Sequence, residues 1–394
     1  MRLASSEMKA IALGLLAALL LAGCTLGKPA AKATPKPSPR AAVSPAPASS
    51  PTQLHAPGPL HFNVRAVAQG LEAPWALDFG QDDSLWLTER PGRVRIVRNH
   101  QLLPDPALTL NVVSQPGCEG GLLGLAVRSP YVYLDYTYAG GGGNTDRVSR
   151  FHIDGDHLTG EQVLLDGIPG GACYHFGGRL KIGPDGMLYV TTGEGFVASR
   201  AADPNNLSGK ILRLNLDGSG ESMFAWGFRN PQGLAFDQKG RLYASNNGPS
   251  GDLGLCCHDS LYLVAQGGFH GWPAWAANVK TSYSAAGLPA RTPPIAESGG
   301  DTWAPSGMTF YQRSIDEVPT LLVATLRGQA LRRFILDPAN PGGVVSNEVV
   351  LSGEGRLRDA VTGPEGCLYV LTSNRDGRGS PHAGDDRVLQ LCPV

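Results

Sequence analysis

Charge is scarce in this sequence, and neither sign dominates. Lys and Arg number 33 against 34 Asp and Glu, for a net charge of −1, and charged residues make up 17% of the chain. A near-neutral chain lacks the basic footprint of a nucleic-acid-binding protein, so we expect no nucleic-acid partner. No Cys-x-x-Cys pair supports a zinc site. Long helical periodicity is also absent, which favours an all-β fold.

The longest apolar run lies at the N-terminus and is short for a membrane-spanning helix. Arg2 and Lys9 lead into the apolar residues 11–23, and the run ends Leu-Ala-Gly-Cys at Cys24. This is the pattern of a lipoprotein signal peptide, residues 1–24, with lipidation at Cys24. We therefore expect an exported protein, lipid-anchored on the periplasmic or extracytoplasmic face of a membrane. The alternative is an ordinary secretory peptide with a chance cysteine.

Residues 25–59 are rich in Pro, Ala, Ser and Lys and contain few large apolar side chains. Such a segment cannot bury enough surface to offset its ordering entropy, so it is predicted to be a disordered tether. The remaining residues, 60–394, are enough for one large domain.

Six cysteines remain besides Cys24, and an even number in an exported chain favours disulfides. Cys367 and Cys392 lie on the last two strand-like runs and are expected to pair. Cys118 with Cys173 is the second expected pair, which leaves Cys256–Cys257 as a vicinal bridge. His258 and Asp259 lie beside that bridge, but we reject a metal site there because the residues are adjacent and a disulfide accounts for the cysteines.

Internal repetition is the strongest architectural signal. An apolar run, a polar or Gly-containing turn and a second apolar run recur six times, at 76–89, 125–138, 180–193, 234–247, 308–326 and 360–373. Each unit is followed by a further strand-like run, at 93–99, 147–158, 209–218, 259–268, 329–338 and 386–393. Six such units predict an all-β, six-bladed β-propeller with four-stranded antiparallel blades, which would form the catalytic domain. Residues 62–70 are expected to pair with the C-terminal strands and close the ring, and the Gly-rich segment 140–147 to form a hairpin tip.

Candidate ligand-binding residues fall between the strands. Residues 227–236, Gly-Phe-Arg-Asn-Pro-Gln-Gly-Leu-Ala-Phe, place Arg229, Asn230 and Gln232 together, and a Gly248-Pro249 turn follows one strand later. Cationic and amide donors at the mouth of a β-scaffold suit a flat, polyanionic ligand. Propellers use loops that follow the inner strands, and other candidates in such loops are Glu119, His175, Arg327, Arg356 and Arg358. The alternative for His175 is a structural histidine, and the alternative for Arg356 and Arg358 is a surface ion-pair face.

In this order the motifs resemble the soluble PQQ-dependent glucose dehydrogenases and aldose sugar dehydrogenases, the glucose/sorbosone dehydrogenase family. The resemblance runs through segments 70–77, 88–94, 268–273, 305–311 and 368–372. It implies that pyrroloquinoline quinone (PQQ) lies across the channel mouth, held by Asn230, Arg327, Arg356 and Arg358. It also implies a Ca²⁺ ion beneath PQQ, bound by the main-chain carbonyls of Gly248 and Pro249.

The same resemblance implies a reaction. His175 matches the base that takes the proton from the anomeric hydroxyl of an aldose, while hydride passes from C1 to the quinone. Arg229 matches the group that stabilises charge on the quinone oxygen. The product would be a lactone, and the electrons would leave to an external acceptor.

Some residues depart from the family pattern, mostly at the substrate wall. Glu119 stands where the glucose dehydrogenases have Gln, and Tyr174 replaces a small polar residue before the base; with Gln232 these are the predicted substrate contacts. Arg327 stands for Lys, Ser373 for Asp and Asn247 for Gln or His. The cofactor is therefore predicted with more support than the sugar.

Two other functions remain open. A Ca²⁺-dependent propeller hydrolase of the lactonase type would need carboxylate and Asn side chains in the channel, and the arginine-rich set argues against it. A non-catalytic propeller that binds a carbohydrate or a protein would take up no cofactor. Asp252 and Asp259 are candidates for a second, structural Ca²⁺.

Overall fold

A computed structural model describes residues 57–311, 318 and 320–394. The predicted signal peptide, Cys24 and the tether up to residue 56 lie outside the described residues. Within the described part, helix is confined to α1 (Ala198–Ala202) and a 3₁₀ turn, η1 (Asp252–Gly254). None of the described helices is long and apolar enough to cross a membrane.

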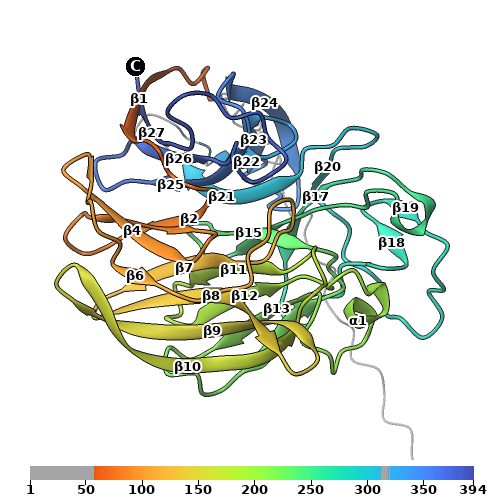
Figure 1. Cartoon of the computed structure of the whole chain (residues 1–394). Helices are drawn as coiled ribbons and strands as arrows, with labels where there is room; N and C mark the ends of the chain where they lie inside the picture. The colour runs from red at the N-terminus through yellow and green to blue at the C-terminus, as the bar shows by residue number, and fades with distance from the viewer. Residues whose placement is uncertain (1–56, 312–317, 319) are drawn as a thin grey trace, which may run out of the picture. The chain divides into compact units, whose positions relative to one another are not determined.

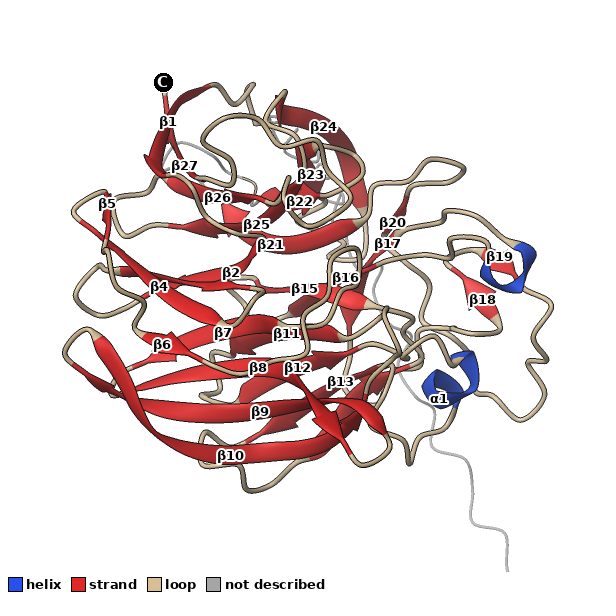
Figure 2. Cartoon of the chain, in the orientation of Figure 1, coloured by secondary structure: helices blue, strands red, loops and turns tan. Residues whose placement is uncertain are grey.

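Strands make up the rest of the described regular structure and form seven antiparallel sheets, of which six are the blades (Figures 1 and 2). Blade 1 contains β2 (Pro74–Phe79), β3 (Leu85–Glu89), β4 (Arg93–Arg98), β5 (Gln101–Leu102) and β6 (Leu108–Thr109). Blade 2 contains β7 (Leu122–Arg128), β8 (Tyr131–Gly140), β9 (Gly143–Asp154) and β10 (His157–Pro169). Blade 3 contains β11 (Gly177–Ile182), β12 (Leu188–Thr192), β13 (Lys210–Leu214) and β14 (Ser222–Trp226).

The second half of the ring repeats this plan. Blade 4 contains β15 (Pro231–Phe236), β16 (Leu242–Asn246), β17 (Ser260–Val264) and β20 (Ala296–Glu297), with a small hairpin of β18 (Trp275–Ala276) and β19 (Val279–Lys280) inserted before β20. Blade 5 contains β21 (Pro305–Tyr311), β22 (Thr320–Thr325), β23 (Ala330–Leu336) and β24 (Val344–Ser352). Blade 6 contains β25 (Leu357–Thr362), β26 (Leu368–Thr372), β27 (Val388–Pro393) and β1 (Phe62–Ala68).

The predicted six-bladed propeller is confirmed, including its closure. β1 pairs antiparallel with β27, with Phe62 opposite Pro393, so the first described strand completes the last blade. The Gly-rich segment is a hairpin tip, where Gly140 of β8 pairs with Gly143 of β9. The three expected disulfides, Cys118–Cys173, Cys256–Cys257 and Cys367–Cys392, are all present.

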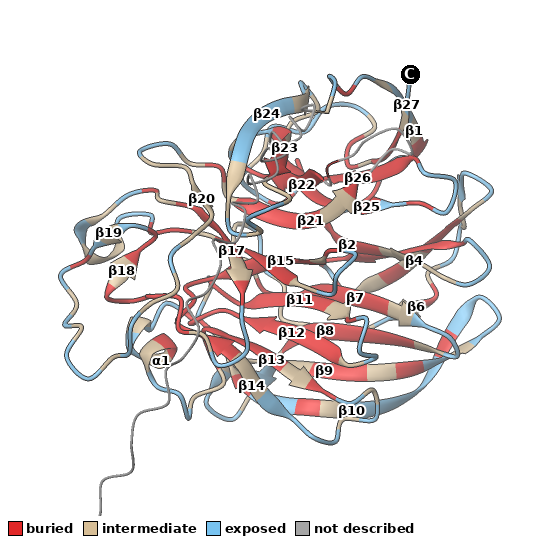
Figure 3. Cartoon of the chain, turned by 180° about the vertical axis from the view of Figure 1, so that it is seen from behind, coloured by how far each residue is buried: buried red, intermediate tan, exposed pale blue. Residues whose placement is uncertain are grey.

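The first strand of each blade is the innermost, and these strands pack against one another in the order β2, β7, β11, β15, β21, β25 and back to β2. Figure 3 shows them as largely buried. Close approach here requires glycine, since a Cβ on Gly307 would lie 1.7 Å from Asp359 Oδ1. The same carboxylate accepts a 2.6 Å hydrogen bond from Arg179 Nη1, which joins blades 3 and 6 across the channel. This buried pair lies among the innermost strands.

Candidate active site

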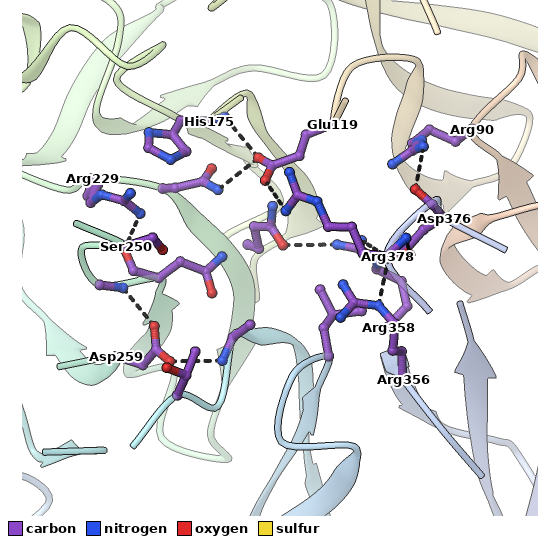
Figure 4. A pocket seen from close by; sticks show the side chains of 17 residues that line it. Arg90, Glu119, His175, Arg229, Ser250, Asp259, Arg356, Arg358, Asp376 and Arg378 are labelled. Atoms are coloured by element: carbon purple, nitrogen blue, oxygen red, sulfur yellow. Dashed lines mark hydrogen bonds and ion pairs between the residues drawn. The ribbon is translucent and has the colours of Figure 1, made fainter. Parts of the chain in front are cut away.

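One pocket gathers most of the predicted site residues (Figure 4). The residues that line it lie at one end of the ring. Most belong to segments that precede a blade's innermost strand or follow its second strand, whereas the sequence predicted loops that follow the inner strands. Five arginines and three carboxylates line it: Arg90, Arg229, Arg356, Arg358, Arg378, Glu119, Asp259 and Asp376. Four other predicted residues also line the pocket: His175, Asn230, Gln232 and Gly248.

His175 lies just before β11 and is 5% exposed. Its Nδ1 is 2.5 Å from Oε1 of Glu194, a buried carboxylate two residues after the end of β12. The carboxylate fixes the orientation of the imidazole, because it engages one ring nitrogen and leaves Nε2 as the nitrogen available for chemistry. A histidine held in this way is arranged to accept a proton from a molecule in the pocket.

Glu119 lies at the centre of a small network beside His175. Its Oε2 accepts the backbone N–H of His175 at 2.9 Å, and its Oε1 accepts Arg378 Nη1 at 3.0 Å. Burial raises the pKa of Glu119, but the charges of His175 and Arg378 outweigh burial and leave the pKa below its ordinary value. Glu119 is thus a carboxylate at neutral pH. The Cys118–Cys173 disulfide ties the two loops together, and Glu119 N–H donates to Cys173 O at 2.8 Å.

Arg229 is buried against the pocket wall and is held by a bidentate ion pair. Its Nε and Nη2 donate to the two oxygens of Asp252 at 2.6 and 2.9 Å. Asn246 Oδ1 accepts the backbone N–H groups of both Arg229 and Asn230 at 3.0 Å, so the end of β16 shapes the loop before β15. A guanidinium fixed by two parallel hydrogen bonds is a preorganised positive charge.

The opposite wall is a cluster of arginines around Asp376. Arg356 Nε donates to Asp376 Oδ2 at 2.9 Å, and Arg90 Nη2 donates to the Asp376 carbonyl at 3.2 Å. Arg358 Nη1 donates to Gln232 Oε1 at 2.9 Å. Burial, opposed by Asp376 and assisted by the charges of Arg356 and Arg90, lowers the pKa of Arg358 to about 9. The positive charge here is only partly neutralised within the protein.

The Gly248-Pro249 turn borders the pocket through Gly248. Its N–H donates to Asp259 Oδ1 at 2.7 Å, and a Cβ on Gly248 would lie 1.9 Å from the Cys257 carbonyl oxygen, so no other residue fits. Asp259 Oδ2 accepts the backbone N–H groups of Trp303 and Ala304. Asp252 and Asp259 are thus bound to protein donors. Among the described residues no group of three or more His, Cys, Asp and Glu side chains forms a metal-binding cluster, and the structure offers no support for a second Ca²⁺ site there.

A comparison with family models decides the family. Residues 71–380 match the model of the glucose/sorbosone dehydrogenases. The chain belongs to the glucose/sorbosone dehydrogenase family.

This chain is similar to named sugar dehydrogenases and to proteins of known structure in the same family. Aldose sugar dehydrogenase YliI of Escherichia coli is 28% identical, over 81% of this chain and 92% of its own length. The PQQ-bound aldose sugar dehydrogenase of Streptomyces coelicolor is 32% identical with a TM-score of 0.71, over 85% of this chain and 99% of that one. A Thermus thermophilus structure, provisionally assigned as an oxidoreductase (glucose dehydrogenase), is 40% identical with a TM-score of 0.74, over 84% and 100%.

Three residues expected at the site of this family member lie outside the pocket lining. Arg327 is exposed, while Leu326 before it lines the pocket, because both residues lie in the tight turn between β22 and β23, where the Arg327 N–H donates to the Trp303 carbonyl at 3.1 Å. Tyr174 is 38% exposed and lies at the rim. Pro249 is buried behind Gly248, and its carbonyl accepts Cys257 N–H at 2.9 Å.

Sequence reasoning missed four charged residues of the site: Arg90, Glu194, Asp376 and Arg378. Each follows the second strand of a blade, at the end of the ring where the pocket lies. Polar residues directly after these strands were the available signal, since Glu194 closes the run Thr-Thr-Gly-Glu and Asp376 and Arg378 lie in Asn-Arg-Asp-Gly-Arg. Ser373 is buried and outside the lining, and Asp376, three residues later, supplies a carboxylate instead.

Proposed function

We propose that this protein is a PQQ- and Ca²⁺-dependent aldose sugar dehydrogenase, which oxidises the sugar at C1 to a lactone and passes the electrons to an external acceptor. The observation that carries the proposal is the meeting, in one pocket, of an oriented histidine with an arginine cluster of incompletely neutralised charge. The names of the relatives, among them a quinoprotein glucose dehydrogenase of Acinetobacter calcoaceticus that is 27% identical, support it.

The arginine cluster fits a polyanionic cofactor. Nε of Arg90 and Nε of Arg358 are buried and have no hydrogen-bond partner in the described part of the chain. PQQ carries three carboxylates, and an anion beside these groups would satisfy the free donors and offset the burial and the neighbouring arginines that together lower the pKa of Arg358. Arg356, Arg358 and Asn230 would hold PQQ, with Arg90 as an addition that the sequence did not predict.

Gly248, which lines the pocket, would hold Ca²⁺ through its carbonyl oxygen, the ligand type that a hard cation prefers, and the Pro249 carbonyl, which accepts the Cys257 N–H, would contribute its second lone pair. When bound, PQQ would supply a hydride acceptor and Ca²⁺ a Lewis acid. Gly248 suits this role because its backbone is fixed on both sides, by Asp259 Oδ1 on the N–H and by the tight contact with Cys257.

The protein's own residues would handle the proton and the charge. Nε2 of His175 would take the proton of the anomeric hydroxyl, while Glu194 holds Nδ1 and stabilises the imidazolium that forms. Arg229, fixed by Asp252, would present positive charge where negative charge develops.

Glu119 and Gln232 would contact the sugar. The ionised Glu119 can accept a sugar hydroxyl. The Oε1 of Gln232 is engaged by Arg358, which leaves its amide N–H₂ as a donor.

Equilibrium titration of the purified protein with PQQ, with Ca²⁺ and with a chelator in its place, tests the cofactor assignment. We expect one Ca²⁺-dependent PQQ site per chain. No binding under either condition would contradict the proposal and leave the non-catalytic binding propeller or the lactonase-type hydrolase.

We also propose that the chain is exported and held at a membrane by a lipid on Cys24, on the basis of the N-terminal sequence alone. The Cys24→Ala variant should then move from the membrane fraction to the soluble fraction and lose incorporation of labelled fatty acid. Membrane association that survives this change would contradict the anchor.

A further inference from the structure

Two exposed aromatic side chains flank His175 at the pocket rim. Phe196 is 58% exposed and Tyr174 is 38% exposed, among the few large apolar or aromatic side chains that the described part of the chain leaves in solvent. The ring centroid of Phe196 lies 5.0 Å from that of His175 and 6.1 Å from that of Tyr174. We call Tyr174 and Phe196 the aromatic platform.

The surrounding structure holds the aromatic platform in place. Phe196 has φ of 61°, a left-handed conformation that a bulky residue rarely adopts. Before it, Gly195 N–H donates to the carbonyl of His175 at 3.1 Å, and the strand-end loop leaves no room for a side chain at Gly195. The guanidinium of Arg378 lies 5.0 Å from the centroid of the Tyr174 ring. A strained backbone that keeps an aromatic ring in water beside the base indicates a ligand contact.

The pocket itself offers a sugar almost only polar contacts. Ala304 and Leu326 are the two apolar side chains of its lining, and both lie in blade 5, away from the loops that carry the platform. His175 is buried, whereas Tyr174 and Phe196 beside it are exposed, so a sugar whose C1 hydroxyl meets His175 Nε2 would direct its far end toward the aromatic platform. A glycosyl unit attached to that end would leave the pocket there. Pyranose rings have an apolar C–H face that stacks on aromatic rings, and their hydroxyl edge matches the adjacent Glu119–Arg378 ion pair.

We propose that Tyr174 and Phe196 form a subsite for the glycosyl unit attached to the sugar that is oxidised, so that reducing oligosaccharides are preferred over free monosaccharides. This inference rests on the proposed function. Phe196 supplies the main stacking face, and Tyr174, fixed by Arg378, supplies a second face with a hydroxyl.

Steady-state kinetics of the full-chain holoenzyme test the subsite with glucose, maltotriose and cellotriose as probes. We expect at least one trisaccharide to have a higher kcat/KM than glucose. Phe196→Ala should lower kcat/KM for that trisaccharide about 5- to 10-fold, mainly through KM, with less than about a 2-fold change for glucose. Phe196→Trp should retain the preference. Val345→Ala on β24, which removes a side chain that is 61% exposed, is the matched control and should change neither substrate.

Saturation-transfer NMR gives a readout that does not need turnover. With the preferred trisaccharide, protons of the second ring should receive strong saturation in the wild type and little in Phe196→Ala.

An equal loss of activity on glucose and trisaccharide in Phe196→Ala would overturn the inference. A change confined to the KM of the electron acceptor would also overturn it, because the aromatic platform would then be a docking site for the acceptor. Absence of turnover on every sugar, with second-ring saturation that depends on Phe196, would overturn the proposed function and support the subsite.

Discussion

Nδ1 of His175 lies 2.5 Å from Oε1 of Glu194, although His175 precedes the β11–β12 hairpin in the sequence and Glu194 follows it. The hairpin returns the chain to the same end of the ring, where Gly177 of β11 pairs with Thr192 of β12. The backbone locks the arrangement further, because Gly195 N–H donates to the His175 carbonyl. The blade's own geometry therefore sets the orientation of the imidazole.

Replacing Glu194 with Gln should lower kcat by about 100-fold while KM changes little, since the base loses its orientation and the charge that stabilises its protonated form. Steady-state kinetics on the PQQ-loaded variant measure kcat and KM separately. An unchanged kcat would show that the pair is only structural.

The family resemblance implies that Arg358 and Arg327 both bind PQQ, whereas the structure places only Arg358 in the pocket lining. Arg358→Met should raise the Kd for PQQ about 10- to 100-fold, because a charge-assisted contact to a carboxylate is lost. Arg327→Met should change it less than about 2-fold, since Arg327 is exposed and outside the pocket lining. Fluorescence titration with PQQ checks both, and equal losses would place Arg327 at the cofactor after all.

The ion pair between Arg229 and Asp252 predicts that kcat depends on the orientation of the Arg229 side chain as well as on its charge. Arg229→Lys keeps the charge but cannot form the two parallel hydrogen bonds to Asp252, so kcat should fall at least about 10-fold. Asp252→Asn leaves Arg229 in place but weakens its hold, and it should give a smaller loss of the same kind. A wild-type kcat in Arg229→Lys would show that position alone suffices.

The Cys118–Cys173 disulfide should matter for catalysis as well as for stability. It joins the loops that carry Glu119 and His175, so Cys118→Ala/Cys173→Ala should raise the sugar KM and lower the free energy of unfolding by about 2–5 kcal/mol. Cys367→Ala/Cys392→Ala, which opens a bridge in blade 6, is the control and should lower stability without changing KM. Kinetics with thermal unfolding of both variants separate the two effects, and equal KM values would contradict the positioning role.

His270 predicts acid sensitivity. Burial lowers its pKa to about 4, against hydrogen bonds to the backbone that raise it, and the ring stacks on Phe228 at 4.3 Å. A lowered pKa means that the unfolded chain takes up the proton first as pH falls, so stability present above pH ~6.5 is lost progressively toward pH ~4, by roughly 3 kcal/mol. Denaturant unfolding at several pH values should show this slope, and His270→Gln should flatten it. A slope identical in the variant would assign the loss to other groups.

The repeated hairpins and the ring closure were predictable because strand periodicity and turn residues are local signals. Arg229, Asn230 and Gly248 were accessible in the same way, since they lie within short motifs. The network of charged side chains around the pocket was not predictable from local sequence signals. Glu119 and Arg378 are 259 residues apart and meet only when the closed ring brings loops of blades 2 and 6 to the same pocket. Arg327 shows the limit of a motif, because the motif does not specify which side chain of the turn between β22 and β23 faces the pocket and which faces solvent.

The aldose sugar dehydrogenase assignment is tested most directly by turnover of the full chain on glucose and other aldoses with an artificial electron acceptor, with PQQ and Ca²⁺ added separately and together. We predict reduction of the acceptor only when both are present, with the lactone as product and about a 100-fold or greater loss in His175→Ala. Turnover that is independent of PQQ, or PQQ binding without oxidation of any aldose, would contradict the account.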